Sequence, residues 1–148
     1  MNLIQTLLLP LLIFLCGGML ARAQLIVTVS PTKFIGQKAV VPLTMTNNLD
    51  EKIESARAAA FLVDGQGKML GQSSKWVIGG TRERSALEPN AATKFNFVIS
   101  SNHPFTGTNI SVKIVFERIV LDGDKLADIN RDVQIQSAVS KTTAYYSH

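Results

Sequence analysis

Few side chains in this sequence are suited to acid–base or nucleophilic chemistry. The 148 residues include one cysteine, and the histidines are His103 and His148. A serine or cysteine nucleophile needs a nearby base that a third group orients, and neither histidine stands in a motif that supplies one. Carboxylate pairs of the glycosidase type are not excluded by counting, but Glu83, Glu88 and Glu117 fall on expected loops or outward-facing strand positions. We therefore expect no catalytic residues and no enzymatic activity.

Three aspartates, Asp122, Asp124 and Asp128, lie close together and carry the hard oxygen ligands that Ca²⁺ favours. No EF-hand or repeat surrounds them, and Asp-Gly is ordinary turn chemistry. Thiolate and imidazole ligands are nearly absent from the chain. The favoured interpretation is a polar hairpin with no metal and no cofactor, and cation binding by the three aspartates is the alternative.

The least generic segment contains Trp76, a glycine pair and the arginines Arg82 and Arg84. Tryptophan and arginine are over-represented at binding hot spots, so these three side chains could form a rim that grips an acidic group or a sugar. The competing interpretation, which the apolar neighbours of Trp76 favour, buries the indole in the core and leaves the arginines as loop charges. His103, in another polar loop, completes the set of candidate binding residues.

The composition limits the kind of molecule that carries these residues. The chain is 46% hydrophobic and 18% charged, with a formal net charge of +4. A chain of this length has room for one domain, and this composition excludes collagen, a coiled coil, a disulfide-stapled mini-protein and a disordered acidic tail. The lysines are scattered and form no basic stripe, so no nucleic-acid partner is expected.

The N-terminal segment has the layout of a secretory signal peptide. An apolar run ends at Cys16, a glycine pair follows, and Ala21-Arg22-Ala23 supplies small residues at the positions that a signal peptidase reads. We therefore predict a signal peptide over residues 1–23 that is cleaved between Ala23 and Gln24, and an exported protein that is periplasmic or extracellular.

Two alternatives to cleavage stay open. Residues 3–21 are long enough for an uncleaved membrane anchor, which would be the chain's contact with a membrane, and Cys16 could belong to a lipoprotein signal. If cleavage occurs as predicted, residues 24–148 contain no cysteine, so the domain has no disulfide. Its fold then depends on the hydrophobic core alone.

Beyond this segment, apolar and polar residues alternate with a period of two, which is typical of strands. The expected strands are 25–30, 39–46, 53–63, 68–72, 75–78, 93–100, 109–121 and 128–136. Turn signals separate them, and the clearest is Asp64-Gly65-Gln66-Gly67. This pattern predicts a single antiparallel, immunoglobulin-like (fibronectin-like) β-sandwich of seven or eight strands over residues 24–136, followed by a flexible polar tail over 137–148.

Several details of the sandwich follow from residue types. Pro42 lacks an N–H, so its strand should be an edge there or be bulged. The alanines 58–60 could suggest a helix, but small residues also suit a strand against which another layer packs closely. The aromatic residues expected to supply much of the core are Phe61, Trp76, Phe95, Phe97 and Phe116.

Residues 41–98 contain a strand that ends in Thr46-Asn47-Asn48, then Phe61-Leu62-Val63-Asp64-Gly65, then Leu87-Glu88-Pro89-Asn90 before the Phe-rich segment Thr93–Phe97. This part of the chain resembles the FxLYD-type and related immunoglobulin-like domains of exported bacterial proteins. The resemblance implies a non-enzymatic envelope or secreted module that is accessory to other proteins, and it implies no catalytic residues.

The expected function is therefore protein interaction or structural support in the bacterial cell envelope or the medium. The expected partner is another envelope or secreted protein. Contact would occur through loops at the ends of the sandwich or through strand addition at an exposed edge. The first alternative is a polysaccharide-binding accessory domain, which predicts that Trp76 or the pair Tyr145-Tyr146 is exposed. The second is a small secreted enzyme or an inhibitor.

Overall fold

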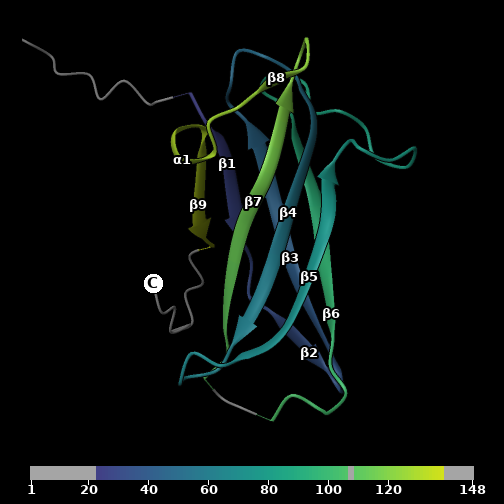
Figure 1. Cartoon of the computed structure of the whole chain (residues 1–148), viewed down its shortest axis with the longest axis vertical. Helices are drawn as coiled ribbons and strands as arrows, with labels where there is room; N and C mark the ends of the chain where they lie inside the picture. Colours follow the sequence, from purple (N-terminus) through teal and green to yellow (C-terminus); the bar gives the residue numbers. More distant parts are fainter. Residues whose placement is uncertain (1–22, 107–108, 139–148) are drawn as a thin grey trace, which may run out of the picture.

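The chain folds into two β-sheets that pack face to face (Figure 1). The computed structural model describes residues 23–106 and 109–138. The elements within these residues are, in chain order, β1 (Leu25–Val29), β2 (Lys33–Ile35), β3 (Lys38–Asn47), β4 (Ile53–Val63), β5 (Met69–Ile78), β6 (Ala92–Ser100), β7 (Ser111–Leu121), β8 (Lys125–Leu126), α1 (Ile129–Asp132) and β9 (Val133–Ser137).

Each sheet has a simple order of strands. Sheet A runs β6, β3, β1, β9, and β2 continues the line of β1 beside the first residues of β3. Sheet B runs β5, β4, β7, β8. Every strand pair is antiparallel except β1 with β9, which are parallel. The prediction of an all-β sandwich is confirmed, and the parallel pair is a feature that alternation alone does not reveal.

The core lies between the sheets and is built by alternation along the strands. On β6, Phe95, Phe97 and Ile99 are buried while the residues between them are exposed. On β4, Ala56, Ala58 and Ala60 are all fully buried. The alanine-rich segment is therefore a strand whose small side chains lie against the opposite sheet, as the strand interpretation requires, and the helical alternative is wrong.

Pro42 lies in the middle of an internal strand, because β3 is paired on both sides. On the side where the proline lacks its N–H, β1 ends at Val29 and β2 begins at Lys33, so no ladder hydrogen bond is lost there. The carbonyl of Pro42 accepts a hydrogen bond from Ser30 N on the same side, at 2.9 Å. The proline is tolerated because it faces a break in the neighbouring strand.

Two residues that were expected in the core, Trp76 and Phe61, lie on the outer face of sheet B instead. Trp76 pairs in register with Arg57, and Phe61 pairs with Gln72 and Lys113, so both aromatic rings lie on the outer face of sheet B. Both side chains are only half-buried and neither packs against the core cluster. The correction has a physical reason: residue type indicates that a strand exists, but the face on which a side chain lies is set by pairing register.

Some element boundaries also differ from the expected ones. Residues 68–72 and 75–78 form one continuous strand, β5, and β2 and β8 are additional short strands. Asp128 ends the extended chain because its carboxylate accepts hydrogen bonds from the backbone N–H groups of Asn130 and Arg131, which caps α1. The last strand is therefore β9 rather than 128–136.

The polar tail was predicted to begin at residue 137, but Ser137 is in β9 and Ala138 N donates to Val29 O. The remainder of that tail and the predicted signal peptide, up to residue 22, lie outside the described residues. So do Tyr145, Tyr146 and His148.

Candidate binding surfaces

The predicted binding residues do not form one site, because they lie at opposite ends of the sandwich. Arg82 and Arg84 are in the loop between β5 and β6, and His103 is in the loop that follows β6 at the other end (Figure 1). A strand of the length of β6 spans about 30 Å. The His103 ring makes no hydrogen bond to the residues described, and the backbone N–H of His103 donates to Ser101 Oγ at 3.3 Å.

Trp76 is held on the outer face of sheet B by a chain of polar contacts. The Arg57 guanidinium carbon lies 5.6 Å from the centre of the indole ring. Arg57 Nε lies 3.3 Å from Glu117 Oε2, and Ser74 Oγ donates to Glu117 Oε1 at 2.9 Å. The arginine beside the tryptophan is therefore Arg57, from the neighbouring strand, and not one of the loop arginines that the sequence suggested.

Gly80 packs directly against the same indole. It has a φ of +76°, and a Cβ at this position would lie 2.4 Å from Trp76 Cδ2. Gly79 is equally constrained, since a Cβ there would meet the Glu54 carbonyl oxygen at 1.9 Å. Both positions require glycine, and together they bring the loop tightly back over Trp76. The indole is thus held rigidly and is half-buried.

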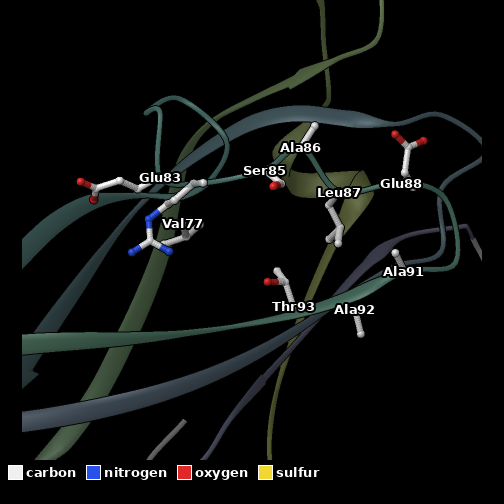
Figure 2. A pocket seen from close by; sticks show the side chains of 10 residues that line it. Val77, Glu83, Ser85, Ala86, Leu87, Glu88, Ala91, Ala92 and Thr93 are labelled. Carbon is white, nitrogen blue, oxygen red and sulfur yellow. The ribbon is translucent and has the colours of Figure 1, made fainter.

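Arg84 occupies a different place, over the ring of Phe95 at 4.2 Å from guanidinium carbon to ring centre. It lines a pocket of about 400 Å³ with Val77, Ser85, Leu87 and Thr93. Figure 2 shows the Leu87 side chain pointing toward Thr93, whereas the carboxylates of Glu83 and Glu88 lie on opposite sides of the pocket. Arg82 is exposed and lies outside the residues that line the pocket.

The loop that forms this pocket is fixed by Asn47, a residue whose role the sequence did not reveal. Asn47 is fully buried. Its side-chain amide donates to Leu87 O at 3.0 Å and Glu51 O at 2.9 Å, and its carbonyl oxygen accepts from Leu49 N. Leu87 also forms an isolated bridge with Ile53. The asparagine that ends β3 therefore joins two loops and holds the pocket in shape.

The two sides of the sandwich differ in how they close. On one side β5 and β6 approach each other closely, and a Cβ on Gly71 would lie 2.7 Å from Ile99 Cγ2. On the other side β7 and β9 make no comparable contact, although both lie along the same border of the molecule (Figure 1). The short helix α1, which directly precedes β9, contacts both strands at one end of this border. We call this border, between the free edge of β7 and β9, the open seam.

The edge of β7 is unpaired along most of the open seam. β4 pairs with one edge of β7, and β8 pairs with the other edge only at Val120 and Leu121. On the edge away from β4, no strand of the described chain lies beside β7 from Ser111 to Arg118. Unpaired strand edges present a row of N–H and C=O groups that can accept another strand. This edge has the backbone chemistry for strand addition.

The interior of the open seam is apolar and incompletely covered. On β9, Ile135 pairs with the buried Val27 and so faces the same side of sheet A, yet it is 43% exposed. The inward-facing residues in the first part of β7 are Val112, which is half-buried, and Ile114, which is buried. Ile135 is exposed because no described strand of sheet B extends over it.

On the closed side, the edge of β5 carries a charge that discourages pairing. Lys75 on β5 is in register with Ala58, an inward-facing residue, and is exposed at the edge. An inward-pointing charge is a common device against edge-to-edge association. The inward positions of β7 are all apolar, so the open seam lacks this device.

The three aspartates do not meet in a metal-binding arrangement. No group of three or more His, Cys, Asp or Glu side chains placed to hold a metal ion occurs among residues 23–106 and 109–138. Asp128 caps α1, Asp122 lies 3.9 Å from Lys52 Nζ, and Asp124 adopts a φ of +59° in the turn after β7. In the same range of residues no helix is long and apolar enough to span a membrane.

Comparisons with known proteins support the fold and nothing finer. No family model matches the chain, and no curated protein matches it. The chain is similar to a solved structure described as "X-ray structure of Northeast Structural Genomics Consortium target SoR45", with 16% sequence identity and a TM-score of 0.51. The match covers 72% of this chain and 80% of that one. At this identity the likeness concerns the sandwich architecture alone.

Proposed function

We propose that this protein is a non-enzymatic, exported immunoglobulin-like module of the bacterial cell envelope or medium. It binds another protein by accepting an extended segment of that partner along the edge of β7. The observation that carries this proposal is the open seam, where an unpaired strand edge lies beside incompletely covered apolar side chains. The export step rests on the signal-peptide layout of residues 1–23.

Strand addition suits this edge for energetic reasons. Each ladder hydrogen bond contributes a net of about 0.5–1.5 kcal/mol, and an added strand would also cover Ile135 and Val112. Main-chain bonds supply affinity in this mode of recognition, and alternate side chains supply specificity. No catalytic group is needed, and the only histidine ring in the described residues, that of His103, has no partner that would orient it for catalysis.

Site-specific photo-crosslinking in the native cell tests this proposal. A photoreactive phenylalanine at position 113, at the free edge of β7, is compared with the same group at position 94, an exposed position on the outer face of sheet A. We expect a discrete adduct from position 113 and none from position 94, with the crosslinked partner peptide mapped to one extended segment. Equal labelling at both positions, or no adduct at position 113, would contradict the proposal.

A polysaccharide-binding role is the second candidate, and one observation favours it. Trp76 lies half-buried on the outer face of sheet B with Arg57 beside it, rather than in the core. Aromatic platforms of this kind can stack on sugar rings, and the neighbouring arginine can bind hydroxyl or acidic groups.

Fluorescence separates the two candidates. If a polysaccharide binds here, acrylamide should quench Trp76 strongly in the free protein, and soluble envelope polysaccharide should reduce that quenching. The replacement Trp76→Ala should remove polysaccharide binding measured by affinity electrophoresis, whereas Phe34→Ala, a distant exposed aromatic on β2, should not. A shielded indole with blue-shifted emission would count against this role.

A further inference from the structure

We propose that the segment received by the edge of β7 alternates apolar and acidic residues. This inference rests on the proposed function, because it names the chemistry of the partner that would occupy the open seam. It is argued from the side chains that an added strand would meet on its two faces.

The inward face of an added strand must be apolar. Side chains of a strand point alternately to the two faces of a sheet, so every second residue of the incoming segment would point into the open seam. There it would meet Val112, Ile114 and Ile135. A polar group placed among these side chains would lose its hydration without gaining a hydrogen-bond partner.

The outward face of an added strand meets positive charge. Lys113 and Arg118 are exposed on the outer side of β7, with Val115 between them. Neither has a carboxylate within ion-pair distance among the described residues. Acidic residues at the outward positions of the incoming strand would lie directly across from these cations, where opposite charges stabilise strand pairs.

The one carboxylate on the free edge of β7 is already engaged. Glu117 is the extra residue of a bulge against β4, where Arg57 pairs with Arg118 and Ala58 pairs with Phe116. Its two oxygens bind Arg57 and Ser74. Glu117 therefore does not cancel the charge of Lys113 and Arg118, and the edge presents a net positive row to its partner.

The same features disfavour a second copy of this chain as the occupant. Two antiparallel β7 strands centred on Val115 would place Lys113 opposite Glu117 of the other copy, a carboxylate that Arg57 and Ser74 already hold. A partner segment that brings its own free carboxylates does not meet this obstacle.

Two synthetic peptides test the inference directly. Both match the length of Ser111–Arg118; one alternates valine with glutamate and the other alternates valine with lysine. We expect the glutamate peptide to bind roughly tenfold more tightly in fluorescence anisotropy at low salt, from two cross-strand ion pairs and the absence of repulsion. This preference should shrink in about 0.5 M salt, since exposed charges are screened. Amide signals of residues 111–118 should shift in nuclear magnetic resonance spectra.

A charge exchange supplies the matched control. Lys113→Glu should weaken the glutamate peptide roughly fivefold and strengthen the lysine peptide, because one cross-strand pair changes sign. Lys94→Glu, an exposed substitution on β6 in the other sheet, should leave both affinities unchanged. Thermal unfolding of both variants checks that the fold is intact.

The outcomes separate the inference from the function on which it rests. Binding at residues 111–118 with no preference between the peptides would overturn the acidic partner and leave strand addition standing. Failure of both peptides to bind or to shift these amides would overturn strand addition and the inference together. A stable dimer in light scattering, with residues 111–118 protected from hydrogen exchange before any peptide is added, would replace the acidic segment by a second copy.

Discussion

At the scale of single residues, the most consequential positions are polar or glycine rather than large and apolar. Asn47 is fully buried and joins two loops through three hydrogen bonds. The sequence displays it only as the first of an asparagine pair at the end of a strand. The strand register and the contact with Leu87, 40 positions away, decide which of the two adjacent asparagines is buried. The residue pattern of one sequence contains neither piece of information.

The asparagine pair therefore provides a sharp test. Asn47→Ala removes the donor to Glu51 O and the acceptor of Leu49 N, and leaving such groups unpaired costs about 1–3 kcal/mol each. Leu87 O loses one of two donors and keeps its hydrogen bond from Ile53 N. We expect urea unfolding to show a loss of about 2–4 kcal/mol in the free energy of unfolding. Asn48→Ala, at an exposed position, should change that free energy by less than about 0.5 kcal/mol. Equal losses in both variants would refute the role given to Asn47.

Two glycines with similar backbone conformations give a second test. Gly80 and Gly123 have φ values of +76° and +74°, but a Cβ at Gly123 would meet no atom within 4 Å. Gly123→Ala should therefore show only the cost of the left-handed conformation, about 1–2 kcal/mol. Gly80→Ala adds a clash with Trp76.

The indole reports that clash. We expect Gly80→Ala to cost more than Gly123→Ala in urea unfolding, to shift the emission of Trp76 and to increase its quenching by acrylamide. Unchanged tryptophan fluorescence in Gly80→Ala would mean that the loop does not pack on the ring as described.

At the scale of elements, long strands with clean alternation were predictable and short or irregular ones were not. β4 has the expected bounds, and β3, β6 and β7 differ from expectation by one or two residues at an end. β2, β8 and α1 are too short for a periodic pattern to show. The bulge at Glu117 changes which residues of β7 face inward, so the expected alternation holds to Phe116 and then shifts to Ile119 and Leu121.

The candidate surfaces were predictable only in part, for the same reason. The sequence indicated that Trp76 and the nearby arginines were unusual, yet the register gives Trp76 a partner, Arg57, that lies 19 positions earlier in the chain. The open seam depends on which strand lies beside β7, and strand order is not encoded in the alternation of any one segment.

Adjacent residues on β6 test the register of the fold. Phe97 is fully buried and Val98 is 49% exposed on the opposite face. Phe97→Ala should lower the free energy of unfolding by about 3–5 kcal/mol through lost burial and a cavity. Val98→Ala, on the solvent face, should cost less than about 1 kcal/mol. Chemical denaturation followed by circular dichroism measures both, and a larger loss for Val98→Ala would contradict the assigned face.

At the scale of the whole molecule, stability comes from the apolar interface between two sheets. The chain has one cysteine, at position 16 within the predicted signal peptide, so no disulfide can form within it. The aspartates considered as calcium ligands serve as a cap and as turn residues instead. Burial of apolar surface, at about 25 cal/mol per Å², must therefore supply most of the driving force.

Chelator and reductant should leave this stability unchanged. We expect the thermal midpoint of residues 24–148 to be the same with and without EDTA, and with and without dithiothreitol, in differential scanning calorimetry. A drop of several degrees on adding EDTA alone would reveal a bound cation. Residues 24–148 contain no cysteine, so dithiothreitol serves as the control and should change nothing.

The parallel pairing of β1 with β9 has a mechanical consequence. Of the strands that the structure describes, the first and the last lie side by side and run in the same direction. Tension applied at the N-terminal end of β1 and the C-terminal end of β9 therefore pulls these strands past each other lengthwise. The backbone hydrogen bonds that join β1 (Leu25–Val29) to β9 (Val133–Ser137) then share the load at once, instead of opening one after another. A domain that is held at the N-terminal end of β1 and pulled at the C-terminal end of β9 would be loaded in shear, the direction in which paired strands resist force best.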